Sequence, residues 1–265
     1  MSRILSYSKN VTELSSMDGS IYLDNPLSLN GNTPLYLKLI KFSISSYIPN
    51  VYNYGGVNNA LVRCSKDNGV TWDVIQLSDG VYTIPLINSA IQSAISTYWT
   101  DPSDPGFFLR YNTATYQTYI SIDSSKLAVP SQFCIDFNYN NSRMYELLGF
   151  ITVKSFNTDG NHIASDFAKI DWFGNNISVQ LNGFGPISIL NGKSSLEICN
   201  VPLSTAQVTN EYVYPLSGLV SPWIIINSLT NLAQYSVKFV GEQNGQVLVL
   251  QGSVNLIFEL SQRIY

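Results

Sequence analysis

The stretch that decides the fold is LYLKLIKFSISSYIPNV, at residues 35–51. Its Leu, Ile and Phe residues recur at short spacing with Lys, Ser and Tyr between them, which is typical of a long β-strand. The stretches on either side, SIYLDNPLSL (20–29) and TWDVIQLSDGVYTI (71–84), have the same character. The period then changes, because the apolar residues of INSAIQSAISTYW (87–99) recur at helical spacing.

This change of period predicts one amphipathic helix at about 86–98. Thr83 is placed to cap the helix, and Pro85 is tolerated in its first turn, where a missing N–H has no partner. A short helical turn in NSRMYELLGF (141–150) is expected to end at a left-handed Gly149. The long helix should pack on a sheet, because the chain has no second long amphipathic helix to pair with. The predicted apolar stripe consists of Leu86, Ile87, Ala90, Ile91, Ala94, Ile95 and Tyr98.

The rest of the chain reads as strands separated by turns. Dipeptides that reach positive φ easily, such as Asn182-Gly183 and Asn244-Gly245, indicate hairpins. Many short strands with one helix predict an all-β protein, a jelly-roll sandwich with the helix packed on its sheets. Residues 1–18 lack periodicity and are expected to form an N-terminal arm. Residues 19–265 are expected to form the jelly-roll domain, with an irregular insertion at about 151–195.

The order of these segments resembles the penton proteins, the minor capsid proteins of virophages and polinton-type viruses. The residues that carry the resemblance are Ile48-Pro49-Asn50, Trp72, Gly80-x-Tyr82-x-Ile84, Leu147-Leu148-Gly149-Phe150 and the stretch 236–260. Each motif is common in β proteins, so the order and spacing carry the match. The resemblance implies a single jelly roll that forms a homopentamer at the vertex of an icosahedral virion and contacts a double-jelly-roll major capsid protein.

Composition leaves a second function open. Charged residues make up only 12% of the chain, against about a quarter in an average soluble domain. A surface built from Ser, Asn, Thr, Gln and Tyr suits burial against neighbouring subunits. An extracellular β-sandwich that binds carbohydrate or a receptor, on a fibre or in a lectin-like module, has a similar composition and is the alternative.

Charge and targeting signals narrow the partners. The net charge is −4 and the basic residues are scattered, which argues against recognition of nucleic acid. The N-terminus lacks an apolar signal region, and no apolar stretch is long enough to span a bilayer. We therefore expect synthesis in the host cytoplasm. Cys64, Cys134 and Cys199 are expected to be reduced thiols.

No motif indicates an enzyme or a cofactor. The only histidine, His162, lies in a segment expected to be a loop, and the chain has no GxSxG motif. Asp101 and Asp104 lie in a Pro-rich loop and are expected to be solvated rather than a catalytic pair. Asp67-Asn68-Gly69 lacks the alternating acids of a calcium loop and predicts a hairpin turn.

Tyrosines and apolar residues supply the interface candidates. Two tyrosine groups, one around Pro49-Asn50 and one at Tyr111, Tyr116 and Tyr119, suit either subunit contacts or sugar stacking, and we favour contacts. The apolar residues of the N-terminal arm are expected to dock on a neighbour. The interface candidates are Ile4, Leu5, Tyr7, Tyr47, Pro49, Asn50, Tyr52 and Tyr54.

Overall fold

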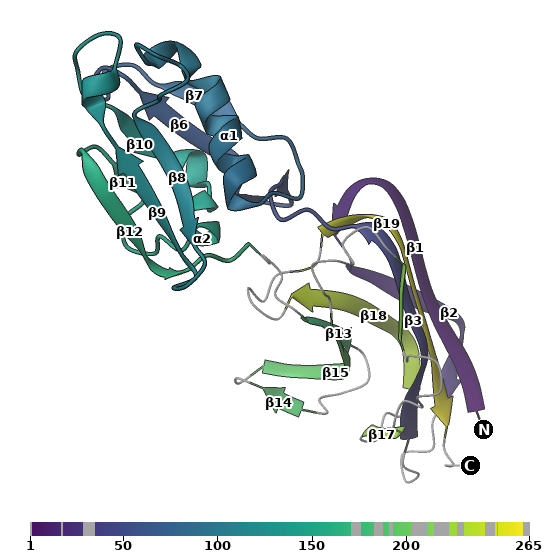
Figure 1. The fold of residues 1–265 in the computed structure, drawn as a ribbon. Coiled ribbons are helices and arrows are strands. Elements are labelled where there is room, and N and C mark those ends of the chain that lie inside the picture. The colour runs from purple at the N-terminus through teal and green to yellow at the C-terminus, as the bar shows by residue number, and fades with distance from the viewer. Residues whose placement is uncertain are drawn as a thin grey trace. The chain divides into compact units, whose positions relative to one another are not determined.

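A computed structural model describes residues 2–16, 18–28, 35–170, 176–182, 188–190, 193–202, 211–214, 223–226, 231–241, 247 and 249–261. The chain divides into two units. Unit 1 comprises Met1–Ile48 and Phe173–Tyr265, and unit 2 comprises Pro49–Trp172. Unit 2 is therefore a continuous insertion between two halves of unit 1 (Figure 1).

Unit 1 contains two antiparallel sheets. Within the described residues, the first has the order β1-β19-β3-β16, with β17 also paired to β3, and the second has the order β14-β15-β13-β18-β2. The strands of the first sheet are β1 (Ser2–Ser16), β3 (Leu35–Tyr47), β16 (Glu211–Tyr214), β17 (Trp223–Ile226) and β19 (Val249–Ser261). Those of the second are β2 (Asp18–Ser28), β13 (Asn176–Asn182), β14 (Ser188–Leu190), β15 (Lys193–Pro202) and β18 (Asn231–Gly241).

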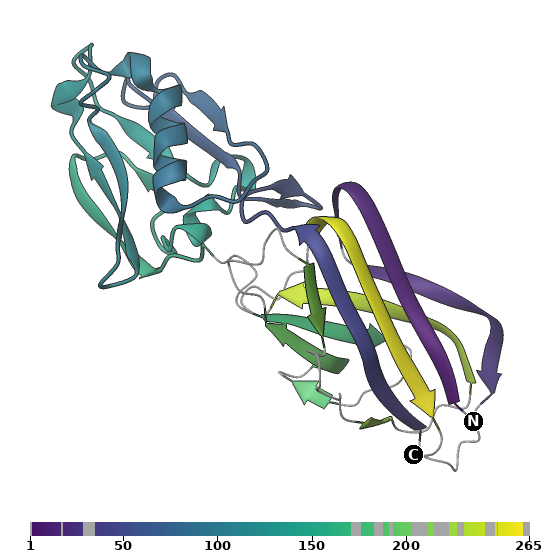
Figure 2. The ribbon, with the colours of Figure 1, turned by 45° about the vertical axis from the view of Figure 1, so that its right-hand side comes forward.

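This strand order is that of a jelly roll. The chain passes repeatedly from one sheet to the other, and the first and last described strands, β1 and β19, lie side by side (Figure 2). The sheets pack face to face, since the rings of Phe42 on β3 and Phe239 on β18 have centroids 5.6 Å apart. Tyr235 of the second sheet meets Phe258 of the first edge-on, with centroids 5.5 Å apart. The predicted fold class is confirmed.

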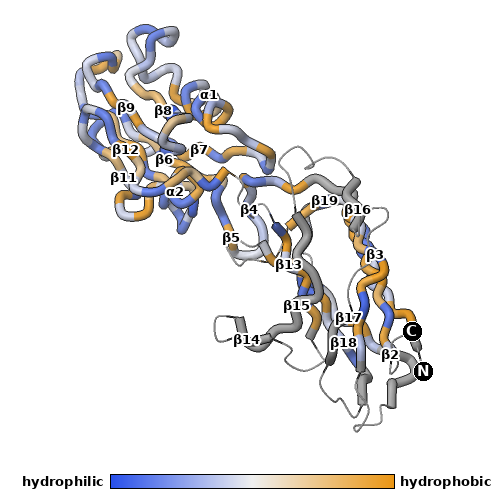
Figure 3. The backbone as a smooth tube through the Cα atoms, turned by 60° about the horizontal axis from the view of Figure 1, so that its bottom comes forward, coloured by the Kyte–Doolittle hydropathy of each residue, from blue (hydrophilic) through white to orange (hydrophobic). Residues whose placement is uncertain are grey.

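The pattern at residues 35–51 produces a long strand for a simple reason. Leu37, Leu39, Phe42 and Ile44 are buried, while Ile40 is 39% exposed. The register with β19 shifts at this point: Ile257 pairs with Lys41 and Phe258 with Leu39, so Ile40 is an extra residue on β3, a β-bulge. The bulge lets inward residues resume at Phe42 after two outward ones. Figure 3 shows β3 as mostly hydrophobic with polar residues between.

Residues 1–18 differ from the expected arm. Ser2–Ser16 form β1, paired antiparallel with β19 from Ser2↔Ser261 to Ser16↔Val249. Leu5 and Tyr7 are buried on its inner side. Pairing with a long partner strand, together with these two buried side chains, offsets the entropy of ordering the segment.

Unit 2 has two main sheets and one packed helix. In the described residues one sheet has the order β11-β10-β6-β7 and the other β12-β9-β8, beside the β4-β5 ribbon. The strands are β4 (Asn53–Tyr54), β5 (Val57–Asn58), β6 (Leu61–Ser65), β7 (Asp73–Gln76), β8 (Phe107–Asn112), β9 (Gln117–Ile122), β10 (Cys134–Asp136), β11 (Ser155–Phe156) and β12 (Gly160–Phe167). The α-helices are α1 (Ile84–Ala94) and α2 (Met144–Leu147), and the 3₁₀ turns are η1 (Ser96–Tyr98), η2 (Ser124–Lys126) and η3 (Tyr139–Asn141).

Helix α1 begins as expected but lies in unit 2, beside β8. The Thr83 side chain accepts a hydrogen bond from the Leu86 N–H at 3.4 Å. The helix is joined to β8 by the side chains of Asn88 and Gln92, which bond the backbone of Leu109 and Phe107 at 2.7 Å. The helix therefore packs on a sheet, but on one of unit 2 and not of the jelly roll.

The apolar stripe of α1 differs from the predicted set. Ile84, Ile87, Ile91 and Ile95 are buried, whereas Leu86 is 52% exposed. Leu86 lies in the first turn, directly after Pro85, and its exposure places it outside the buried stripe.

The short helix α2 ends at Gly149, as predicted. Gly149 has φ 82°, and a Cβ there would lie 2.5 Å from the Asp166 carbonyl oxygen. The Phe150 N–H closes the turn by bonding the Tyr145 carbonyl at 2.7 Å. Glycine is thus required both for its backbone conformation and for this close approach.

The insertion also differs from the expected one. We expected an irregular segment at about 151–195, but the inserted unit begins at Pro49 and includes β12, a regular strand. β12 was missed because its inward positions hold His162 and Ala164 rather than large apolar residues.

Candidate assembly surface

The first sheet of unit 1 has an outer face whose composition follows from strand alternation. Leu5 and Tyr7 of β1 point into the sandwich, so Ile4, Ser6 and Ser8 point outward. On β19, Val254, Leu256 and Phe258 are buried, so Ser253, Asn255 and Ile257 face outward. The outer face of β1 and β19 therefore consists of side chains that do not contribute to the core of unit 1.

We call this surface the Ser/Asn face. Ser8 Oγ donates to Asn255 Oδ1 at 2.7 Å across the β1–β19 pair, so part of the face is already ordered. The face combines neutral polar residues with a few aliphatic ones. It comprises Ser6, Ser8, Asn10, Ser253 and Asn255, together with Ile4 and Ile257, and it borders Ile40 and Lys41 of β3.

The aliphatic residues gather at one end of this face. Ser6 lies opposite Ile257, and Ile4 lies opposite Glu259, so Ile4 and Ile257 are diagonal neighbours. Ile4 is 61% exposed. Charged residues lie next to these aliphatic ones: Lys38 is opposite Glu259, and the exposed Lys41 is opposite Ile257. The neutral polar part of the face, around Ser8 and Asn255, loses less hydration free energy than charged groups would when it is covered by protein.

The three interface candidates on β1 separate into two kinds. Ile4 is exposed on the Ser/Asn face, whereas Leu5 and Tyr7 are buried in the core of unit 1. The Tyr7 ring lies 6.0 Å from that of Phe239, and its hydroxyl donates to the Asp18 carbonyl at 3.4 Å. Burial, with a smaller contribution from the charge of Asp18, raises the pKa of Tyr7 to about 12. Leu5 and Tyr7 thus serve the core of the single chain.

Three candidates around Pro49 are also buried. Pro49, Asn50 and Tyr52 lie inside unit 2, and Tyr54 is half-buried. The side chain of Tyr47 lies outside the described residues. Of this group, Tyr54 alone among the described side chains offers accessible surface for contacts.

Asn50 links separate segments of unit 2 by hydrogen bonds. Its Nδ2 donates to the carbonyls of Tyr82 at 2.7 Å and Ile170 at 2.9 Å, and its Oδ1 accepts from the Tyr82 N–H at 2.7 Å. The Asn50 N–H also bonds the Gly80 carbonyl at 3.1 Å. One buried carboxamide therefore joins the start of unit 2, an internal loop and the segment close to its end. These bonds join two of the segments singled out in the sequence, Ile48-Pro49-Asn50 and Gly80-x-Tyr82-x-Ile84.

The residues considered for catalysis do not form a site. His162 lies in β12, not in the expected loop, with Nε2 2.8 Å from the Thr158 carbonyl and its ring 5.1 Å from that of Phe156. The Ser103 hydroxyl and N–H bind the Asp101 carboxylate and lower its pKa. Asp104 forms an ion pair with Lys126 at 2.6 Å. Both carboxylates are therefore engaged in shaping a loop.

The cysteines show no metal-binding arrangement where they are described. Cys64 and Cys134 are free and buried. Burial, followed by the charge of Asp73 and by Cys134, raises the pKa of the Cys64 thiol. The side chain of Cys199 lies outside the described residues. In the part of the chain that the structure describes, His, Cys, Asp and Glu side chains form no group of three or more that could hold a metal. Likewise, no helix in that part is long and apolar enough to cross a membrane.

Solved structures similar to this chain include the following two. One is a crystal structure of the selenomethionine-labelled mavirus penton protein, with a TM-score of 0.48, 10% identity, and 98% of this chain and 99% of that chain covered. The other is the cryo-EM structure of the Sputnik virophage, with a TM-score of 0.40, 12% identity and 98% of each chain covered. No protein-family model and no curated protein matches the chain.

The Ser/Asn face was missed in the sequence, although a signal for it exists. SYSKN at residues 6–10 alternates Ser and Asn with other residues, and GSVN at 252–255 does the same on β19. Alternating small polar residues predict one solvent-facing side of a strand. Their pairing across β1 and β19 could not be read from the sequence, because the two strands are the first and last of the chain.

Proposed function

We propose that the protein is a structural, non-enzymatic subunit of an icosahedral virus capsid that forms a homopentamer at the vertex. The observation that supports this most is the Ser/Asn face, an outer face of a jelly-roll sheet in which neutral polar residues predominate on β1 and β19. The order of sequence segments, which resembles that of penton proteins, supports the same proposal. The subunit would act in the virion, after synthesis in the host cytoplasm, with no cofactor and no recognition of nucleic acid sequence.

The Ser/Asn face suits a ring contact for an energetic reason. Burying a charge without a partner costs several kcal/mol or more, whereas hydroxyl and carboxamide groups can exchange water for partner hydrogen bonds. A fivefold ring requires a heterologous contact, in which this face meets a different surface of the next copy. The same ring would also contact the double-jelly-roll major capsid protein around it.

The test is the mass of the assembled full chain, measured by native mass spectrometry alone and in the presence of the major capsid protein. The wild-type chain is expected to form five-copy rings. Ser8→Glu, which places a charge in the centre of the Ser/Asn face, is expected to prevent ring formation without lowering the melting temperature. Ser78→Glu is the matched control, because Ser78 is exposed in unit 2 and remote in sequence from β1 and β19.

The results test the vertex role and the use of the Ser/Asn face separately. A wild-type chain that stays monomeric with the major capsid protein present contradicts the vertex role. Rings that form equally well with Ser8→Glu contradict the use of the Ser/Asn face and leave the vertex role standing.

A further inference from the structure

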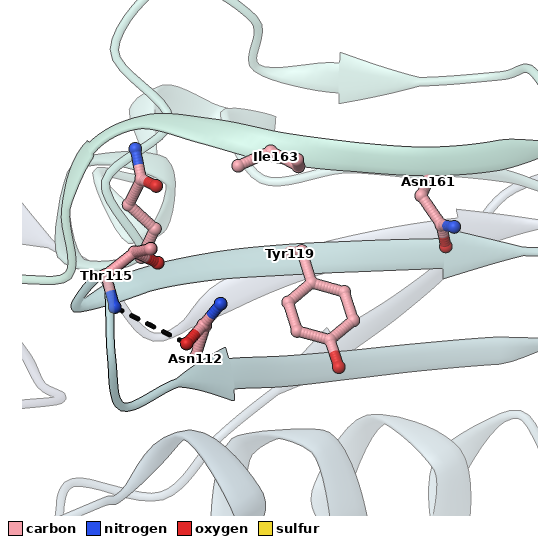
Figure 4. A pocket seen from close by; sticks show the side chains of 6 residues that line it. Asn112, Thr115, Tyr119, Asn161 and Ile163 are labelled. Carbon is pink, nitrogen blue, oxygen red and sulfur yellow. Dashed lines mark hydrogen bonds between the residues drawn. The ribbon is translucent and has the colours of Figure 1, made fainter.

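A shallow depression lies on the outer face of the β8-β9-β12 sheet of unit 2 (Figure 4). Its volume is about 330 Å³, which falls in the range of small-molecule sites. Residues from all three strands and from the β8–β9 turn line it. They are Asn112, Thr115, Gln117, Tyr119, Asn161 and Ile163.

The strand register explains why these side chains meet. Tyr119 of the central strand β9 lies opposite Ile163 of β12, and Gln117 lies opposite Asn112 of β8. Asn161 precedes Ile163 by two positions and so points to the same side. Figure 4 shows the Tyr119 ring in the middle, between Asn112 and Asn161. The result is one aromatic ring surrounded by carboxamides and an aliphatic side chain.

The polar groups of the depression can still both donate and accept hydrogen bonds. Asn112 Oδ1 accepts from the N–H groups of Ala114 at 2.9 Å and Thr115 at 3.4 Å, which orients the Asn112 NH₂ as a donor. Gln117 Nε2 donates to the Ala164 carbonyl at 3.1 Å, which leaves its Oε1 as an acceptor. A ligand with hydroxyl groups, each both donor and acceptor, matches this set.

Two further polar groups are available to a ligand. The Tyr119 hydroxyl and the Asn161 carboxamide have no hydrogen-bond partner among the described residues. Both residues are accessible in the single chain: Asn161 is exposed and Tyr119 is half-buried.

The charges around the depression argue for a neutral ligand. None of the six lining residues is ionisable near neutral pH. Arg110, opposite Tyr119 on β8, has its guanidinium 4.6 Å from the centre of the Phe108 ring, a cation–π contact that holds it along the strand. An anionic ligand would therefore have no cation in the depression to offset its lost hydration.

We propose that this depression binds a neutral saccharide, with a sugar C–H face on the Tyr119 ring. Aromatic rings offer a flat apolar surface to the axial hydrogens of a pyranose, and carboxamides bond its hydroxyl groups. Asn112, Gln117 and Asn161 are the carboxamides placed to do so. Ile163, 69% exposed, closes one side of the depression with aliphatic surface. This inference is independent of the proposed capsid role.

Saturation-transfer NMR on the full chain tests the proposal. The probes are the methyl glycosides of glucose, galactose, mannose and N-acetylglucosamine, each at millimolar concentration, followed by an array of neutral oligosaccharides. We expect at least one probe to bind. Tyr119→Ala should weaken that binding by at least about tenfold, because the stacking surface is lost. Tyr119→Phe keeps the ring and should weaken it only about two- to threefold.

Two variants complete the design. Asn161→Ala removes a carboxamide from an exposed position and should weaken binding about fivefold without a change in melting temperature. Tyr116→Ala is the matched control, because Tyr116 is 61% exposed in the same hairpin and does not line the depression. It should bind like the wild type.

Several outcomes overturn the proposal. The absence of saturation transfer to any probe and of any array signal does so, as does binding that Tyr119→Ala leaves unchanged. The competing occupant of this sheet is protein, because β12 is an edge strand that also exposes Phe167. A dimer of the full chain that Ile163→Asp dissociates, with no probe bound, would show that a second copy covers the face instead.

Discussion

Asn50 is the residue whose replacement should affect unit 2 most directly. Asn50→Ala removes three side-chain hydrogen bonds and leaves the carbonyls of Tyr82 and Ile170 and the Tyr82 N–H without this partner. Unsatisfied buried groups cost about 1–3 kcal/mol each, so we expect a loss of about 2–4 kcal/mol in the free energy of unfolding after partial relaxation. Urea titration of the full chain measures this. Asn53→Ala, at an exposed position nearby, should change it by less than about 0.5 kcal/mol.

Asp67 gives a prediction about pH. The Thr71 hydroxyl and N–H and the Ser65 hydroxyl bind its carboxylate, and they lower its pKa from 3.8 to about 2. A lowered folded-state pKa means that the turn is favoured at every pH above about 4 and loses this support as the pH falls through about 2. The Asp67 carboxyl ¹³C shift should therefore titrate with a midpoint near 2. A midpoint near 3.8 would show that these bonds are not held in solution.

Among the elements, α1 owes its stability to four isoleucines rather than to its whole apolar sequence. Ile91 is fully buried, and Ile91→Asp would leave a carboxylate without a partner under the helix, so we expect a loss of more than about 4 kcal/mol. Leu86→Asp is the matched control, since Leu86 is half exposed and lies in the first turn, where a negative charge is favoured. Thermal unfolding should separate the two. Equal melting temperatures would contradict the buried orientation of Ile91.

Strand β1 is expected to be essential to unit 1, although the sequence alone favoured an arm. Leu5→Ala should cost about 2–4 kcal/mol, because it leaves a cavity in the sandwich. Ile4→Ala, on the Ser/Asn face, should cost less than about 1 kcal/mol in the isolated chain. Deletion of residues 2–16 would also expose the edge of β19. Hydrogen exchange in β19 and β3 should then rise sharply, and unchanged protection there would restore the arm hypothesis.

The elements differ in how far the sequence could predict them. The residue pattern predicts strands at 35–47 and 211–214, and β3 and β16 have these bounds, because aliphatic and aromatic residues are frequent in both segments. β1 was missed because Ile4 and Leu5 are adjacent and apolar, which breaks the alternation, and because Lys9 follows on the inner side, bonded to the Ser16 carbonyl at 2.6 Å. Only part of the proposed saccharide site could be predicted. The sequence identifies Tyr119 as an aromatic candidate, whereas Asn112 and Asn161 reach it only through the register of β8, β9 and β12.

At the scale of the whole molecule, the insertion could not be located from the sequence. The boundary falls inside the run Ile48-Pro49-Asn50, where composition does not change, and no Gly- or Ser-rich linker marks it. The jelly-roll order required strands from both ends of the chain to be assigned together. Local patterns specify strands, whereas the pairing of β1 with β19 depends on contacts across almost the full sequence.

The division into two units predicts that unit 2 folds by itself. Residues 49–172 have their own buried core, including Ile87, Ile91 and Phe133, and the Asn50–Ile170 hydrogen bond of 2.9 Å holds the start and the end of the unit together. Ends that lie close together allow a unit to be removed and the gap closed by a short linker. Residues 49–172 expressed alone should therefore unfold in one cooperative transition and give dispersed amide NMR signals.

A chain that lacks unit 2 tests whether unit 1 alone can assemble. With residues 49–172 replaced by a short Gly/Ser linker, unit 1 keeps β1, β19 and the whole Ser/Asn face. If that face forms the ring, this shortened chain should still assemble to five copies, and Ser8→Glu should still prevent assembly. It should bind none of the saccharide probes, because the Tyr119 depression lies in the part removed. Folded but monomeric unit 1 would show instead that unit 2 supplies the contact, and would move the search for the interface to its exposed residues.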